Sequence, residues 1–257
     1  MFGKLINWLR GKQEAAALPD PLWQDTIAEL PFLAALNADE QNRLRRLSEA
    51  FLAEKEFTTA GGLQLTDAMC VSIAAQGCLP ILNLGLDTYR GWVGIVVYPD
   101  EFVIPRSVED EFGVVHEYDD VASGEAWAGG PLLISWRDVQ MAGSGYNVVI
   151  HEFAHKIDML SGAPDGCPPL PANLSREAWE DTLLAAYDDF CQVVDAAEAG
   201  NEETLLDPYA AENPGEFFAV MSETFFETPQ RLQQIYPALY RQFAAFYRQE
   251  PAGALRR

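Results

Sequence analysis

The chain has 257 residues, of which 49% are hydrophobic and 11% aromatic, so it can bury a core and is not disordered by composition. Its 39 acidic and 17 basic residues give a formal net charge of -22 at pH 7. A surface this acidic repels phosphate groups, which excludes nucleic acid and anionic membrane surfaces as expected direct partners.

The compartment is predicted from targeting signals and cysteines. The amino-terminal stretch MFGKLINWLRGKQ has apolar positions interrupted by Lys4 and Arg10, so it does not resemble a signal peptide. No apolar run approaches the roughly 18 residues that a membrane span needs. The four cysteines form no C-x-x-C pair, which favours reduced, buried thiols over a disulfide. We therefore expect a cytoplasmic protein.

Residues 1–85 are predicted to be mainly helical. WQDTIAELPFLAAL and NADEQNRLRRLSEAFLAEKEF have apolar residues three to four positions apart, which is typical of a helix with one buried face. Asn37 and Glu40 match a capping box, which predicts a helix start there. LTDAMCVSIAAQGCLPILNL predicts a buried helix that Gly77 and Pro80 interrupt.

Residues 86–257 are predicted to hold a small sheet and then more helices. The strand candidates are GWVGIVVYP, EFVIP, FGVVHEYDDV, GEAWAG and GPLLISW. They are short and separated by Gly, Pro and Asp, which favours a mainly antiparallel sheet. Residues 130–136 are expected to form either an edge strand beside the cleft or an ordinary core strand. Helices are expected over NVVIHEFAHKIDMLS, SREAWEDTLLAAYDDFCQVVDAAEA, NPGEFFAVMSETFFE and TPQRLQQIYPALYRQFAAFYRQ. The order predicts one α+β domain over residues 1–257, mainly helical, with the sheet beside the first of these helices.

That first helix carries the strongest chemical signal. The chain has only three histidines, and His151 and His155 lie four positions apart in NVVIHEFAHKIDML. Residues at this spacing share one helix face, so both imidazoles can bind one ion. Glu152 lies between them, where it can take a proton from a water molecule, as in the H-E-x-x-H pattern of zinc peptidases. The competing interpretation is a pair of core histidines bonded to carboxylates.

A catalytic zinc site needs a third protein ligand. Asp158 is the nearest acidic residue, but on a straight helix it lies about 10 Å along the axis from His151. The first glycine after His155 is Gly162, too late to bend the chain back. We therefore reject Asp158 as a ligand and expect a supporting or helix-end role. His116 lies in a strand-like stretch and is expected to be structural.

A carboxylate from a second helix is the better third ligand. The candidates are Glu212, Glu216, Glu223 and Glu227. Glu216 is preferred because it lies on the first turn of a strongly apolar helix, and Glu223 follows because it shares that face. Asn213 to Glu216 also spells a capping box with Pro214 at the first helical position, a role that involves no metal.

Two segments together resemble a known family. HEFAHKIDMLSG with DPYAAENPGEFFAVMSETFFE is similar to the Mlc titration factor A family of bacterial zinc metallopeptidases, which resembles the catalytic domain of anthrax lethal factor around its active site. The resemblance runs over most of the chain and implies a zincin-like fold with one zinc ion. It implies His151, His155 and Glu216 as zinc ligands, Glu152 as general base and Tyr209 as a catalytic phenol.

The resemblance also implies a function. Members are cytosolic, cleave small substrates as aminopeptidases and bind a sugar-responsive transcriptional repressor. The sequence therefore predicts a zinc-dependent peptidase of aminopeptidase type with a peptide substrate. The alternative is a regulator-sequestering binding protein with a structural or autoinhibited zinc site, and a non-peptidic zinc hydrolase is a third interpretation. No fourth Cys or His ligand is evident beside the pair, which favours a site with an open position.

Overall fold

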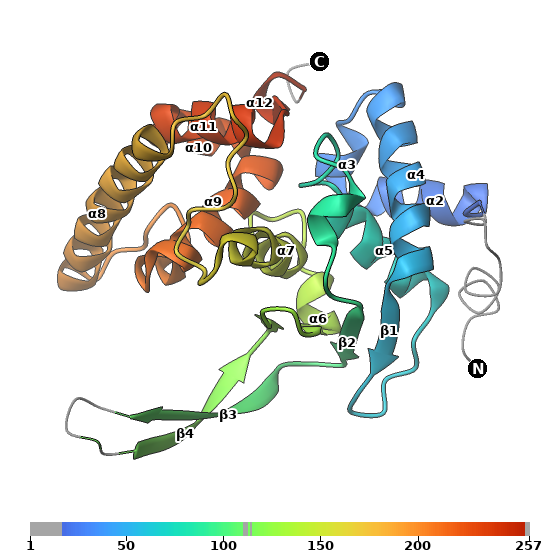
Figure 1. Cartoon of the computed structure of the whole chain (residues 1–257), viewed down its shortest axis with the longest axis horizontal. Coiled ribbons are helices and arrows are strands. Elements are labelled where there is room, and N and C mark those ends of the chain that lie inside the picture. The colour runs from blue at the N-terminus through green and yellow to red at the C-terminus, as the bar shows by residue number, and fades with distance from the viewer. Residues whose placement is uncertain (1–16, 110–112, 114, 255–257) are drawn as a thin grey trace.

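The computed structural model describes residues 17–109, 113 and 115–254, and Figure 1 shows the course of the chain. The amino-terminal stretch around Lys4 and Arg10 lies outside these residues. The first part of the described chain holds four helices, with one strand between the last two: α2 (Asp20–Glu29), α3 (Pro31–Ala34), α4 (Ala38–Glu54) and α5 (Asp67–Cys78). The capping box at the start of α4 is confirmed. α5 ends just before Pro80, as predicted, but Gly77 lies inside it and does not interrupt it.

The main sheet has four strands in the order β1-β2-β6-β5. These are β1 (Glu56–Thr59), β2 (Gly94–Tyr98), β6 (Leu132–Ser135) and β5 (Gly124–Ala126). The β1–β2 and β2–β6 pairs are parallel, and only β5–β6 is antiparallel. In this sheet the expected antiparallel pairing is limited to β5–β6, because α5 and the 3-10 helix η1 (Leu86–Tyr89) return the chain to the same end between β1 and β2. The separate hairpin described below is antiparallel, as expected.

Of the two interpretations of residues 130–136, the core strand is confirmed and the edge strand is wrong. β6 lies between β2 and β5, and all four of its residues are buried. β5 is the strand at that end of the sheet instead. β1 was missed altogether, since its residues continue the helical pattern of α4 in the sequence. There the chain leaves the helix at Lys55, whose Nζ is buried against the carbonyl oxygens of Tyr89 and Trp92.

Strands β3 (Phe102–Glu109) and β4 (Val115–Ala122) form a separate antiparallel hairpin that extends away from the helices (Figure 1). Its base packs on the sheet through a small cluster of Phe102, Ile104 and Leu133. Farther along, Tyr118 is 53% exposed. The hairpin is therefore anchored to the sheet through its base.

The rest of the chain is mainly helical. Its elements are α6 (Trp136–Val139), α7 (Val148–Asp158), η2 (Met159–Ser161), α8 (Arg176–Gly200), η3 (Pro208–Ala211), α9 (Pro214–Glu227), α10 (Pro229–Ile235), α11 (Pro237–Tyr247) and α12 (Pro251–Ala254). The predicted last helix is split at Tyr236 and Pro237, because proline cannot continue the hydrogen-bond ladder but suits a helix start. The predicted α+β class with a mainly helical fold is confirmed.

α7 runs through the middle of the hydrophobic core, which extends from Leu18 to Ala252. Its residue Phe153 packs against the rings of Phe51 and Tyr89. Gly77 on α5 permits this approach, because a methyl group there would lie 2.6 Å from the Phe153 ring. α7 therefore provides a rigid base for any side chain on its other faces. The four cysteines are free thiols, as predicted. Among the described residues, every helix is too short or too polar to cross a bilayer.

Candidate metal centre and active site

The histidine pair is placed by the way α7 begins. Asn147 is the N-cap, and its side-chain oxygen accepts a hydrogen bond from the Ile150 N–H at 2.9 Å. One turn later, His151 and His155 lie on one face, with ring centroids 4.8 Å apart. The spacing of four residues therefore brings the two imidazole rings together on one side of α7, as predicted.

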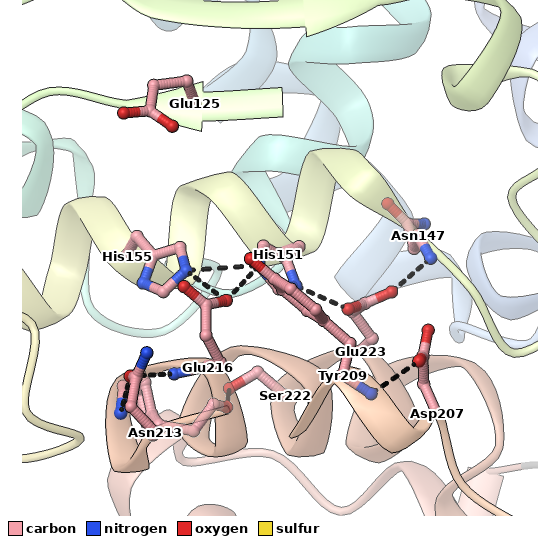
Figure 2. Close-up of polar contacts among 12 residues, drawn as sticks. Glu125, Asn147, His151, His155, Asp207, Tyr209, Asn213, Glu216, Ser222 and Glu223 are labelled. Carbon is pink, nitrogen blue, oxygen red and sulfur yellow. Dashed lines mark hydrogen bonds and ion pairs between the residues drawn. The ribbon is translucent and has the colours of Figure 1, made fainter. Parts of the chain in front are cut away.

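The third group comes from α9, which packs against α7. Asn213 caps α9 by accepting from the N–H groups of Gly215 and Glu216, as the capping pattern predicts. The Glu216 carboxylate, however, points at the histidines and lies between their rings (Figure 2). Its Oε2 is 3.0 Å from Nε2 of His151 and 3.1 Å from Nε2 of His155. Spacing in the sequence left Glu216 and Glu223 open, and it is Glu216 that faces both imidazoles.

These three groups fit a metal ion. The two Nε2 atoms are 3.2 Å apart, close to the two distances from Glu216. In a tetrahedral zinc site with bonds of about 2.0–2.1 Å, neighbouring ligand atoms lie about 3.3–3.4 Å apart. One ligand atom from each of His151, His155 and Glu216 lies within 4.8 Å of the other two, which is close enough for the three residues to bind one ion. Nitrogen and oxygen donors in this arrangement suit zinc.

The electrostatics of the group also favour a cation at this point. Burial alone would lower the pKa of His151, but hydrogen bonds to Glu216 and Glu223 outweigh it and hold that pKa well above its ordinary value. Burial would raise the pKa of Glu216, yet its contacts with both imidazoles hold that pKa well below the usual range. The pocket between these side chains therefore stabilises positive charge.

The other candidate ligands lie elsewhere. Glu223 contacts the far side of the His151 ring, with its Oε1 2.8 Å from Nδ1. Asp158 is buried at the end of α7, where it accepts the Gly166 N–H at 2.7 Å. Glu227 bonds to the loop before α7. Glu212 and His116 are exposed, the latter on strand β4 of the hairpin.

Glu152 is only 5% exposed and borders the same cavity as His151. Burial raises the pKa of its carboxyl to about 7. Gly124 on β5 makes room for it: a methyl group at position 124 would sit 2.4 Å from Oε1 of Glu152. The carboxylate therefore lies between the metal-facing helix and the edge strand, and a side chain at position 124 would displace it.

The cavity next to Glu152 has a volume of about 260 Å³. Tyr209, on η3, borders it and is 53% exposed, with its ring centroid 6.1 Å from that of His151. Asp207 caps η3 by accepting the Tyr209 N–H. Burial of the phenol, followed by nearby carboxylates such as Glu216, raises the pKa of Tyr209, so the hydroxyl keeps its proton.

The opposite wall of the cavity is formed by the base of the hairpin and β5. Arg106 from β3 makes two hydrogen bonds to Glu125, at 2.9 and 2.8 Å, and one to Asp120 at 3.2 Å. Arg106 is one-third exposed. This cluster ties the hairpin to the edge strand beside Glu152.

Four contributors to this site were not expected from the sequence: Asn147, Gly124, Arg106 and the link from Glu223 to His151. Asn147 has the signal of a helix cap, in the first position of the motif stretch. The other three depend on contacts between distant elements, such as β5 with α7, and a single sequence carries no local pattern for them.

Comparison with known proteins agrees with this geometry. A family model described as glucose-regulated metallo-peptidase M90 matches residues 5–248. Proteins named Mlc titration factor A from Salmonella arizonae and Salmonella paratyphi B are 39% and 38% identical over 255 residues, which is 98% of this chain and 100% and 95% of theirs. The protein of that name from Cronobacter sakazakii is 37% identical, with 98% and 95% coverage. The predicted resemblance is confirmed, and the chain belongs to the glucose-regulated metallo-peptidase M90 family.

Proposed function

We propose that this metallopeptidase-type protein is a zinc-dependent peptidase that acts as an aminopeptidase. The observation that supports it best is the approach of His151, His155 and Glu216 to within 3.2 Å of one another, with Glu152 beside them. One zinc ion held by these three residues would acidify a water molecule and polarise the scissile carbonyl. We also propose that residues 1–257 form one domain and that the protein works in the cytoplasm.

Glu152 acts as the general base in this proposal. Its carboxylate takes a proton from the attacking water and later gives it to the leaving amine. Burial supports this role, because removing the carboxylate from water raises the pKa of Glu152 and makes the group a better proton acceptor than a solvated carboxylate. Tyr209 lies across the cavity and keeps its proton, so its hydroxyl can donate a hydrogen bond to the oxyanion that forms on the substrate.

The substrate backbone is expected to bind along β5. This strand lies at one end of the four-stranded sheet, borders the cavity and contains Gly124 directly beside Glu152. An extended peptide can add to such an edge through main-chain hydrogen bonds. The strand expected to pair with the substrate is therefore β5, in place of residues 130–136.

Binding of a sugar-responsive transcriptional repressor is a second candidate function. The relatives are named Mlc titration factor A, which supports a partner of this kind for the present chain. In the alternative proposal the chain sequesters such a regulator and the zinc site is structural or autoinhibited. The buried Glu152 argues for the enzyme, because a structural site has no use for a general base.

The test uses amino-acid anilides as substrates, with zinc-loaded protein, chelator-treated protein and two variants. Glu152→Gln should keep one equivalent of zinc and lose about 10²–10⁴-fold in rate. Tyr209→Phe should also keep zinc and lose less. Full activity in Glu152→Gln would refute the base assignment. If no anilide or small peptide is cleaved by the zinc-loaded wild type while a repressor binds equally well with and without Glu152, the sequestering function is supported instead.

A further inference from the structure

We propose that Glu223, held in place by Asn147, is the positioning residue that orients His151 for the metal ion. This inference rests on the proposed zinc site, since it assigns a role to a residue behind one of its ligands. Glu223 lies two turns after Glu216 on α9 and is only 3% exposed. Figure 2 shows its carboxylate on the side of His151 that faces away from Glu216.

Both oxygens of Glu223 have a defined partner. Oε1 lies 2.8 Å from Nδ1 of His151, and Oε2 accepts the backbone N–H of Asn147. When the carboxylate accepts from Nδ1–H, the imidazole proton is fixed on Nδ1 and the lone pair on Nε2 points toward Glu216 and His155. The contact therefore sets both the tautomer and the rotation of the His151 ring.

Asn147 connects this contact to the rest of the fold. It is fully buried, and its Nδ2 donates to Gln76 Oε1 at 2.9 Å and to Glu227 Oε1 at 2.8 Å. Glu227 in turn accepts the N–H groups of Gly143 and Gly145 at 2.8 and 2.7 Å. Elements α5, α7 and α9 and the loop before α7 thus meet at one asparagine, which prevents Glu223 from shifting.

An amide could not replace the carboxylate here. With the His151 proton on Nδ1, as the proposal requires, Glu223 accepts an N–H at each oxygen, and glutamine would place its own NH₂ group against one of them. A buried donor facing a donor is left without a partner, at a cost of roughly 1–3 kcal/mol. The other histidine lacks this support: within the described structure, Nδ1 of His155 is buried without a hydrogen-bond partner. Of the two histidines, His151 is therefore the one that a carboxylate, that of Glu223, orients through Nδ1.

The experiment measures zinc affinity by competition with a chromophoric chelator in wild type, Glu223→Gln and Ser222→Ala. Loss of a group that orients a metal-binding histidine typically weakens metal binding by about 10–100-fold, and we expect this loss in Glu223→Gln. Ser222 is a matched control, since it is adjacent to Glu223 and fully buried. Its hydroxyl lies 2.8 Å from the Tyr247 hydroxyl and bonds there, not to the metal-binding residues. Ser222→Ala should lower stability and keep the wild-type zinc affinity.

A second measurement needs no variant. In zinc-loaded wild type, the nitrogen-bound imidazole proton of His151 should be assigned to Nδ1 by NMR and exchange slowly with water. Unchanged zinc affinity in Glu223→Gln, an equal loss in Ser222→Ala, or rapid exchange of the His151 Nδ1 proton with water would each overturn the proposal. A wild-type protein that binds no zinc would refute the proposed metal site itself, so the two failures can be told apart.

Discussion

The two walls of the cavity are built in different ways. On the helical wall, α7 and α9 bring together His151, Glu216 and Glu223, whose side chains are all less than one-fifth exposed. On the strand wall, Arg106 and Asp120 form an ion pair in which the side chains are 33% and 42% exposed. One wall is a buried polar network, and the other is a set of charges in contact with water.

This difference indicates that the two walls have different functions. Buried hydrogen bonds in a low dielectric hold their geometry, because breaking one leaves an unpaired group. Partly exposed ion pairs contribute at most about 1 kcal/mol and are screened by salt. The helical wall therefore suits metal binding and proton transfer, whereas the strand wall suits contacts with a substrate that must enter and leave.

The largest effect is expected from removing the third ligand. Glu216→Ala should lower bound zinc well below one equivalent and reduce peptidase activity by roughly 10³-fold or more, because a catalytic zinc site needs three protein ligands. Metal content after dialysis, measured by atomic emission, checks this together with the rate on an anilide substrate.

Asp158→Ala is the matched control for that variant. Asp158 is on the metal-binding helix and fully buried, but it bonds to Gly166 and not to the histidine pair. It should lose roughly 1–3 kcal/mol of stability and keep one equivalent of zinc. The reverse pattern, with zinc lost from Asp158→Ala and kept by Glu216→Ala, would move the third ligand to Asp158.

The next largest effect is expected from a substitution where the two walls meet, at Gly124 beside Glu152. Gly124→Ala puts a methyl group 2.4 Å from Oε1 of Glu152, so the carboxylate must move. A general base displaced by about 1 Å is expected to cost on the order of 100-fold in kcat, with zinc binding unchanged because the ligands come from the helical wall. Steady-state kinetics with a parallel zinc titration measures both.

Gly94→Ala serves as the comparison for this substitution. Gly94 is on β2 of the same sheet, and a methyl group there would meet Pro131 at 3.3 Å, far less severely. Its kcat should stay within a few-fold of wild type. A similar loss of kcat in both variants would mean that the sheet as a whole, and not the clearance beside Glu152, controls the rate.

The same division explains which parts of the molecule could be predicted from the sequence. His151, His155 and the helix that carries them follow from local spacing, and the start of α9 at Pro214 follows from its capping residues. Glu216 was preferred from its place on that helix. The positions of these side chains on their helices could be predicted because helix geometry is fixed within a few residues.

The strand wall could not be predicted in the same way. β1 and the central place of β6 depend on which strands pair, and the pairs here join residues far apart in sequence, such as Phe57 with Ile95 and Val96 with Leu133. The clearance at Gly124 exists only once β5 lies against α7. Register between distant strands has no local signature in a single sequence, so both the mixed sheet and the residue beside Glu152 were missed.

The smallest effect is expected on the strand wall itself. Arg106→Gln removes the bidentate contact with Glu125 and should raise KM for an anilide substrate about 2–5-fold, with zinc affinity unchanged, because partly exposed ion pairs are worth at most about 1 kcal/mol. Arg137→Gln is the control: Arg137 pairs with Asp100 and Glu101 at 2.6 and 3.1 Å and does not line the cavity. Since salt screens these contacts, the difference in KM between Arg106→Gln and wild type should shrink as ionic strength rises. A KM difference that persists at high salt, or a loss of zinc from Arg106→Gln, would show that the strand wall is as rigidly coupled to the metal centre as the helical wall.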